Sequence, residues 1–356
     1  TGFLLKWNRR SIERPAPEGM MMTTTYLGLE LRSPLVASAG PLTQTVSQIE
    51  RLSDTGIGAI VLHSLYAEQI RRTAEADLEL EESYADSFAE ATSYFPTIAA
   101  QADPASSYLS LVERSAAVID VPLIASLNAA AVGDWTQYAR RLADAGAAAI
   151  ECNIYLVPGD VQLTGADVEA RHREIVAAVT SAVDVPVAVK LSPFLSSLGN
   201  LALQLVDDGA AGLVLCNRFL QPQVRVSEMA VVPGVELSTS ADGHVARTWI
   251  ATLRQLTSAS LAGSSGVHNA EDFAAYLLAG ADVVMTTSAL VRHGIGHATR
   301  LLEGLDEWMQ RSGYRSLDDV RGKLAVPADT DGYRYARSGY LAALERAQST
   351  YGSLQG

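Results

Sequence analysis

A lysine ends the strongly apolar stretch Val187–Lys190, and it is the side chain best suited to chemistry. Burying an ammonium group without a partner is costly, so Lys190 must be paired or held ready to react. Three roles fit this residue. It is a structural ion pair, a Schiff-base lysine, or a cation that stabilises a reduced flavin beside its N1–C2 carbonyl region.

Three asparagines help to choose among these roles. Asn128, Asn153 and Asn217 each come at the end of an apolar run. Each one alone is equally well explained as a side chain that satisfies a turn or a strand end. Together they offer paired donors and acceptors that suit a flat, amide-rich heterocycle. A Schiff-base lyase would more naturally show an acid or a base beside its lysine, so the amides favour the flavin FMN.

Two clusters of small residues near the C-terminal third of the chain suit an anion. They are Gly263-Ser264-Ser265-Gly266 and Thr287-Ser288. Glycine amides can approach a phosphate closely, and (β/α)8 barrels often bind phosphate in the loops after strands seven and eight. The alternative is that these glycines only make tight turns. We expect a phosphate site.

The elements that position these residues follow a regular alternation over about 270 residues. Strand-like runs lie at 35–38, 59–64, 122–127, 148–154, 186–191, 212–217, 260–263 and 282–287. Helical patterns lie at 46–55, 108–119, 135–145, 166–182, 201–208, 248–257, 270–279 and 289–310. Eight strands alternating with eight helices predict an α/β protein, a (β/α)8 TIM barrel with a parallel sheet. No Gly-x-Gly-x-x-Gly follows the first strand, which argues against a Rossmann domain.

Two connections are too long for plain loops. One spans 65–105 after the second strand, and its portion 75–90 holds seven acidic residues and no basic one. The other spans 219–247 after the sixth strand and suggests a small β insertion. Both follow the carboxyl ends of strands, so we expect them to cover the mouth of the barrel. We expect residues 1–22 to be an extension, 23–325 the barrel, and 326–356 a tail with a helix.

Composition excludes several classes of protein. The formal net charge of −13 argues against binding to nucleic acids or anionic membranes, which need clustered lysine and arginine. No apolar run reaches the ~18 residues of a membrane span. Cys152 and Cys216 are too few for a disulfide scaffold or an iron–sulfur cluster. His268, His293 and His297 show no metal-ligand spacing, so no metal is expected, and the composition is typical of a cytoplasmic protein.

Several motifs, in order, resemble the dihydroorotate dehydrogenase family of FMN barrels from about Tyr26 to Leu324. They are SPLVASAGP, IECNIY, VAVKLSPF, LVLCNRF and LAGSSGVHNAEDF…GADVVMTTSAL, and the segment GYRSLDDVRGKL is similar to a helix of the soluble class. The segments IASL…GDW and KLSP also resemble the barrel of dihydropyrimidine dehydrogenases. The resemblance implies hydride transfer between a dihydropyrimidine-type ring, dihydroorotate first, and flavin N5.

The resemblance also implies roles for individual residues. Lys190 and Asn153 would contact the flavin ring as catalytic residues, and Asn217 would face the substrate. The other residues that would contact the cofactor are Ala37, Ser38, Gly40 and Ser64 around the ring and ribityl chain, and Gly263, Ser265, Gly266, Thr287 and Ser288 around the phosphate. Asn128, His63 and Arg218 complete the expected substrate side.

The sequence departs from the family pattern where the catalytic base should be. The family has Asn-x-Ser-Cys-Pro-Asn or a close relative, whereas this chain has Asn153-Ile154-Tyr155-Leu156-Val157-Pro158. Tyr155 is the candidate acid or base, although an ordinary tyrosine pKa of about 10 makes it a poor base at neutral pH. His63 stands where the family commonly has lysine. Arg218 replaces Ser or Thr, and it would either pair with a substrate carboxylate or bridge to the acidic segment 75–90.

The expected function is therefore an FMN-dependent oxidoreductase acting on a small molecule. Two alternatives stay open: a divergent flavoprotein acting on another substrate or as a subunit of an electron-transfer complex, and a non-redox, phosphate-binding lyase that uses Lys190. Without a Rossmann segment or cluster cysteines, electrons from a pyridine nucleotide would need a partner chain. Dimers are common in the family, which makes a homodimer a further expectation.

Overall fold

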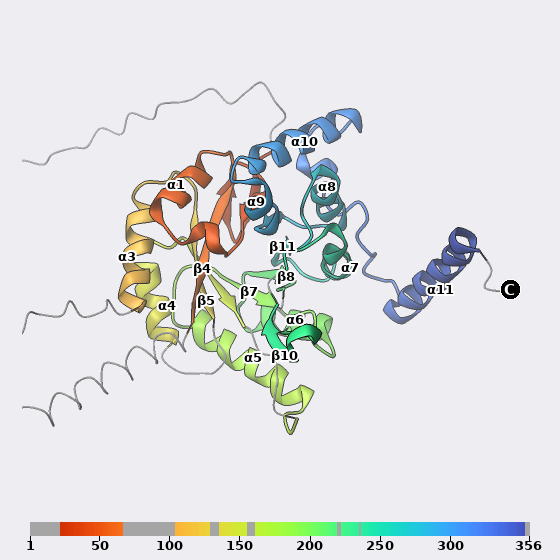
Figure 1. Cartoon of the computed structure of the whole chain (residues 1–356), viewed down its shortest axis with the longest axis horizontal. Coiled ribbons are helices and arrows are strands. Elements are labelled where there is room, and N and C mark those ends of the chain that lie inside the picture. Colours follow the sequence, from red (N-terminus) through yellow and green to blue (C-terminus); the bar gives the residue numbers. More distant parts are fainter. Residues whose placement is uncertain are drawn as a thin grey trace, which may run out of the picture.

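A closed barrel of parallel strands forms the centre of the molecule, as the sequence predicts (Figure 1). The computed structural model describes residues 22–66, 104–128, 135–154, 161–218, 222–234 and 236–352. The barrel strands follow one another in chain order, and the last one closes on the first. They are β3 (Leu35–Ala37), β4 (Ala59–Tyr66), β5 (Leu123–Asn128), β6 (Ala149–Asn153), β7 (Val187–Leu191), β8 (Gly212–Leu215), β11 (Ser260–Ser264) and β12 (Val283–Thr286).

Helices surround this barrel (Figure 1). They are α1 (Val46–Ser53), α3 (Pro104–Ala116), α4 (Trp135–Asp144), α5 (Gly165–Thr180), α6 (Leu198–Asp207), α7 (His244–Leu253), α8 (Ala270–Ala279), α9 (Ser288–His293) and α10 (His297–Arg311). Side chains at the N-caps begin several of them; the Asn269 side chain, for example, accepts a hydrogen bond from the amide of Asp272 at the start of α8. The prediction of one helix over 289–310 is wrong, because Gly294 adopts φ +83° and separates α9 from α10.

A short hairpin closes the amino end of the barrel, and the sequence did not predict it. Strands β1 (Thr24–Tyr26) and β2 (Leu29–Leu31) pair antiparallel across a turn in which Leu27 and Gly28 both have positive φ. The amide of Leu27 donates to the hydroxyl of Ser260 at the start of β11. Tyr26, Leu27 and Leu31 pack against the residues that point into the barrel.

Two apolar layers form because successive residues of a strand point to opposite sides. One layer fills the interior of the barrel and the other lies between strands and helices. The interior layer is apolar near the amino ends of the strands, at residues such as Ile124, Ala149 and Ala188. Two residues further along the same strands, the inward side chains become polar. The fold therefore places polar groups at the carboxyl ends of the strands.

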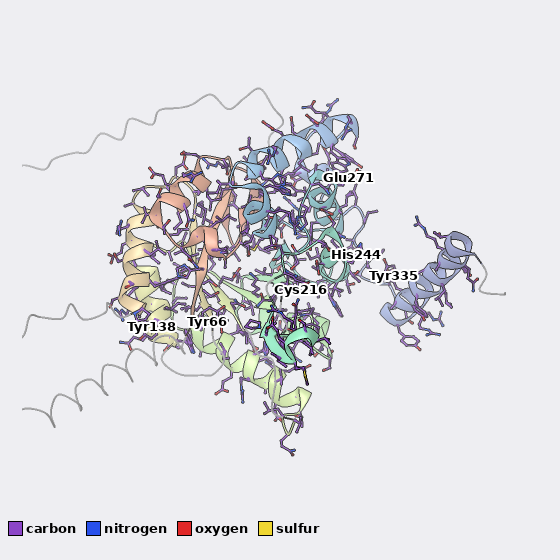
Figure 2. All side chains as sticks on the ribbon, viewed as in Figure 1. Tyr66, Tyr138, Cys216, His244, Glu271 and Tyr335 are labelled. Atoms are coloured by element: carbon purple, nitrogen blue, oxygen red, sulfur yellow. The ribbon has the colours of Figure 1, made fainter. Side chains whose placement is uncertain are left out.

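The two long connections differ in how much of them the structure describes. The predicted β insertion is confirmed in part, because β9 (Pro222–Arg225) pairs antiparallel with β10 (Ala230–Pro233). The acidic segment 75–90 lies outside the described residues. After the barrel, α11 (Gly332–Tyr351) extends away from the barrel helices (Figure 1), and Tyr335 near its start lines a pocket together with Arg247 and Thr248 of α7 (Figure 2). No helix in the described part of the chain is long and apolar enough to cross a membrane.

Candidate active site

Polar side chains from neighbouring strands meet at the carboxyl end of the barrel. Strand register places Asn128 opposite Asn153, and Asn153 opposite Lys190. All three side chains are buried. In a (β/α)8 barrel this end holds the catalytic groups of characterised enzymes. The fold therefore brings Lys190, Asn128 and Asn153 together at this end of the barrel.

Lys190 has an ionic partner that the sequence reasoning missed. Its Nζ atom lies 3.4 Å from Oε1 of Glu151 and 3.3 Å from Oγ of Ser38. Glu151 precedes Asn153 by two residues on β6, so both side chains point into the barrel. An acid therefore does lie beside the lysine. The expectation that no acid or base lies next to Lys190, which favoured a flavin over a Schiff base, is wrong. The carboxylate favours the charged ammonium, whereas a Schiff base requires a neutral amine.

A chain of hydrogen bonds connects this ion pair to the amides. Asn217 Nδ2 donates to Asn153 Oδ1 over 2.6 Å, and Asn153 Nδ2 donates to Ser64 Oγ over 3.2 Å. The hydroxyls of Ser64 and Ser126 are 2.9 Å apart. Ser126 Oγ then donates to Glu151 Oε1 over 3.4 Å. The chain joins side chains from β4, β5 and β6 with Asn217, which follows β8.

One buried amide at this end has an unused donor. Asn128 Nδ2 is buried and has no hydrogen-bond partner among the described residues. Native structures rarely leave a buried donor unpaired, because its desolvation is then uncompensated. The ammonium of Lys190 also has three N–H donors and two described partners. Both groups therefore fit a ligand that brings hydrogen-bond acceptors into the mouth of the barrel.

The loops predicted to hold a phosphate lie after β11 and β12. Ser265 and Gly266 adopt φ of +78° and +66°. A Cβ atom on Gly266 would come within 2.4 Å of the amide nitrogen of Gly243, so this glycine is required where the loop after β11 approaches the residues before α7. Gly263 is required for another reason, because a Cβ atom there would meet the ring of Tyr276 at 2.2 Å.

Several of the remaining residues of the predicted flavin site make hydrogen bonds between a side chain and the main chain. Ala37 ends β3 and is buried, and Ser38 follows it. The hydroxyl of Thr287 donates to the carbonyl oxygen of Ser38 over 2.9 Å, and a Cβ atom on Gly40 would clash with the Thr287 side chain. The hydroxyl of Ser288 accepts from the amide of Ser238. The contacts of Thr287 connect the loop after β3 with the loop after β12, and that of Ser288 connects α9 with the segment before α7.

The predicted substrate residues have partners that limit what they can do. The Nδ1 atom of His63 lies 3.2 Å from the carbonyl oxygen of Thr43, and its ring meets the edge of Tyr108. Burial lowers the pKa of His63, so the imidazole is neutral at pH 7. Arg218 donates to the carbonyl oxygen of Glu236. Tyr155 lies outside the described residues, and its role as acid or base stays a prediction.

Neither thiol can take the place of the family's catalytic cysteine or serine. Burial, with the nearby carboxylate of Glu151, raises the pKa of Cys152 to about 12. Burial raises the pKa of Cys216 to about 12 as well. Cys152 belongs to the layer between strands and helices, so it points away from the polar groups, and Figure 2 labels Cys216 near the strands. In the described part of the chain, no group of three or more His, Cys, Asp or Glu residues is arranged to bind a metal ion.

Comparison with known proteins gives one family. A family model described as dihydroorotate dehydrogenase matches residues 21–309. A dihydroorotate dehydrogenase B (NAD(+)), catalytic subunit, of Methanothermobacter thermautotrophicus is 26% identical over 315 residues, which cover 85% of this chain and 98% of that protein. A putative dihydroorotate dehydrogenase A (fumarate) of Aeropyrum pernix is 28% identical over 57% of this chain and 67% of its own.

A further relative has a different name. The NAD-dependent dihydropyrimidine dehydrogenase subunit PreA of Escherichia coli is 26% identical over 218 residues, which cover 57% of this chain and 53% of that protein. The matches therefore include proteins named for two related ring substrates.

Proposed function

Because the chain belongs to the dihydroorotate dehydrogenase family, whose members are oxidoreductases acting on CH–CH bonds, we propose that it binds FMN. We propose that it transfers a hydride between a carbon of a dihydropyrimidine-type ring, dihydroorotate first, and flavin N5. FMN when bound supplies the two-electron acceptor. The observation that supports this best is that the buried cation Lys190 and the buried Asn128 Nδ2, which has no partner among the described residues, lie at the same end of the barrel on either side of Asn153, because both suit the carbonyl groups of a flat heterocycle.

Each group of residues has a distinct task in this proposal. Lys190, Asn128 and Asn153 bind and orient the ring, and the positive charge of Lys190 favours negative charge on it. Ala37, Ser38, Gly40 and Ser64 line the ring and ribityl chain. The phosphate is held by the loops that contain Gly263, Ser265, Gly266, Thr287 and Ser288. Asn217 faces the substrate, and Arg218 pairs with its carboxylate.

The proton transfer needs a residue other than the family's Ser or Cys. Tyr155 occupies that part of the sequence, and we propose it as the acid or base. His63 is the alternative, because its Nδ1 faces the carbonyl oxygen of Thr43 and must carry the proton there, which leaves Nε2 as an acceptor. Flavin reduction measured in Tyr155→Phe and in His63→Asn distinguishes them: the variant that loses at least about 100-fold in rate identifies the group.

Two kinds of partner follow from the proposal. The relatives from Methanothermobacter and Escherichia coli are named as subunits, so we propose that electrons from a pyridine nucleotide reach this chain through a partner chain. A homodimer is a second proposal. Size-exclusion chromatography with light scattering tests the dimer, and NADH oxidation by the purified chain tests the need for a partner. Rapid NADH oxidation without any added protein would reject the partner chain.

The spectrum of the protein with FMN is the main experiment. We expect flavin bands near ~450 nm that persist through gel filtration. Asn128→Leu should weaken FMN binding at least about tenfold, because it removes a buried donor. Asn200→Leu on the surface of α6 should leave binding unchanged, which makes it the matched control. A colourless protein that cannot be reconstituted with FMN would contradict the proposal.

The choice of substrate needs a second measurement. Anaerobic mixing with dihydroorotate should bleach the flavin, and dihydrouracil provides the comparison because it lacks the carboxylate. Bleaching by dihydrouracil alone would move the assignment toward the reaction named for the Escherichia coli relative. Bleaching by neither would count against both substrates. Treatment with borohydride and a carbonyl substrate should leave Lys190 unmodified, because its ammonium is paired with Glu151.

A further inference from the structure

The side chain of Glu151 contacts both Lys190 and Ser126, the first hydroxyl of the hydrogen-bond chain that leads to Asn217. Its Oε1 atom accepts from Lys190 Nζ and from Ser126 Oγ, each over 3.4 Å. The residue is completely buried, and its Oε2 atom has no partner among the described residues. A buried carboxylate is costly unless it is paired, so its position in the barrel interior calls for a role.

The direction of the hydrogen bonds follows from the chemistry of this carboxylate. An ionised carboxylate can only accept, so the hydroxyl of Ser126 must donate to Glu151. The single proton of Ser126 is then used, and Ser64 must donate to Ser126. Ser64 can therefore only accept from Asn153, which agrees with the Nδ2 atom that faces it. The direction of each hydrogen bond therefore determines the direction of the next one along the chain.

The same direction determines what the last amide presents. Asn153 uses Nδ2 toward Ser64, so its Oδ1 is free to accept from Asn217. Asn217 donates through Nδ2, and its own Oδ1 atom accepts no hydrogen bond from a described residue. The carboxylate thus decides, through two hydroxyls and one amide, which end of the Asn217 side chain faces Asn153, so that Oδ1 and the second N–H of Nδ2 are left for a ligand.

We propose that Glu151 is a positioning residue that aligns Asn153 and Asn217 and holds Lys190 in place. It fixes the donor and acceptor pattern that the mouth of the barrel shows to a ring, so that a ring N–H group is matched by Asn217 Oδ1. This inference deepens the proposed function and rests on it for the identity of the ring. The alignment of the two amides is a property of the chain itself and can be measured without FMN.

Side-chain amide exchange in the protein without FMN tests the alignment. Protein labelled with ¹⁵N-asparagine gives side-chain amide signals, and those of Asn153 and Asn217 are assigned by their loss in Asn153→Asp and Asn217→Asp. In Glu151→Gln, hydrogen exchange at both amides should become about tenfold faster, because a chain without a fixed direction opens more often. Asn217 does not touch Glu151, so a purely structural role would not move its exchange selectively.

Two further variants make the result decisive. Ser126→Ala cuts the chain between Glu151 and Ser64 and leaves the ion pair with Lys190 intact, so it should speed exchange even if Glu151→Gln does not fold. Asp282→Asn is the matched control, because Asp282 is another buried acid, paired with Arg254 at the amino end of the barrel. It should leave exchange at Asn153 and Asn217 unchanged.

The outcomes separate this inference from the proposed function. If the parent protein does not bind FMN, the proposed function fails, while the exchange rates still decide the role of Glu151. Unchanged exchange in Ser126→Ala and in folded Glu151→Gln would overturn the inference, whatever FMN does. An equal increase in Asp282→Asn would also overturn it, because the effect would then be one of general loosening. With FMN bound, Ser126→Ala should lower flavin affinity several-fold, and Asp282→Asn should not.

Discussion

Replacing Lys190 by methionine should destabilise the fold far more than breaking an ion pair on the surface. Nζ of Lys190 and Oε1 of Glu151 are 3.4 Å apart, and the two side chains are 6% and 1% exposed. At an effective dielectric constant of about 20, unit charges at that separation attract by roughly 5 kcal/mol. The variant leaves a buried carboxylate without its counter-ion, so we expect Lys190→Met to cost about 3–5 kcal/mol.

A double-mutant cycle isolates the pair from the packing of either side chain. Glu151→Leu with Lys190→Met removes both charges while keeping the volumes similar, and such replacements are often neutral. Ser126 loses its acceptor in this double variant, at a cost of about 1 kcal/mol. We therefore expect the double variant to lie within about 2 kcal/mol of the parent, although each single change costs more.

Urea denaturation without FMN at pH 7, monitored by circular dichroism, provides the unfolding free energies of the parent, the two single variants and the double variant. Arg225→Met is the surface control, because its pair with Glu228 is 52% exposed on both sides and should contribute under about 1 kcal/mol. The reasoning would be refuted by single variants that each cost less than about 1 kcal/mol and a double variant equal to their sum. That result would mean that the two charges do not interact in the folded protein.

Three other predictions concern groups outside this pair. Iodoacetamide at pH 8 should label Cys152 and Cys216 at least about 100-fold more slowly in the native protein than in urea, because a pKa of about 12 leaves little thiolate; equal rates would contradict their burial. Gly263→Ala should cost about 1–3 kcal/mol through its clash with the ring of Tyr276, and an unchanged melting temperature would contradict that packing. Burial lowers the pKa of His172, so the unfolded state binds a proton more readily and stability should fall as pH drops below about 6.5. His172→Gln should reduce that slope by at most about 1.4 kcal/mol per pH unit, and an unaltered slope in urea titrations would reject the assignment.

The barrel could be predicted from the sequence because its signals are local. Apolar runs of four to eight residues and amphipathic helices repeat in strict alternation, and each observed barrel strand overlaps its predicted run. The closing hairpin was missed because its turn is Leu27-Gly28, which lacks the usual Asn-Gly signal. The break at Gly294 was missed because a glycine within a helical pattern is often tolerated.

The site was predictable where a residue type is unusual for its surroundings. Lys190 stands out in an apolar strand, Asn153 ends β6, and Asn217 follows β8. The prediction rested on the last residue of each strand and did not include Glu151, which lies two residues before the end of β6. Side chains two residues apart in a strand lie on the same face, so the alternation predicts that Glu151 faces the same side as Asn153. The hydroxyl chain through Ser64 and Ser126 joins residues far apart in sequence, and only the strand register shows that they meet.

The order of layers in the barrel explains how this acidic chain presents a cation to a ligand. The hairpin and a mostly apolar layer fill the amino end of the barrel. The next layer holds Glu151 and Lys190, which neutralise each other and can therefore be buried. The amides lie beyond them, at the ends of their strands, and take their direction from the carboxylate below. A thiol base would need to share this inward face, but Cys152 lies between two inward residues and faces the helices. Under the proposed function, the proton acceptor is therefore sought in Tyr155, which follows β6 in the sequence, or in His63 of β4.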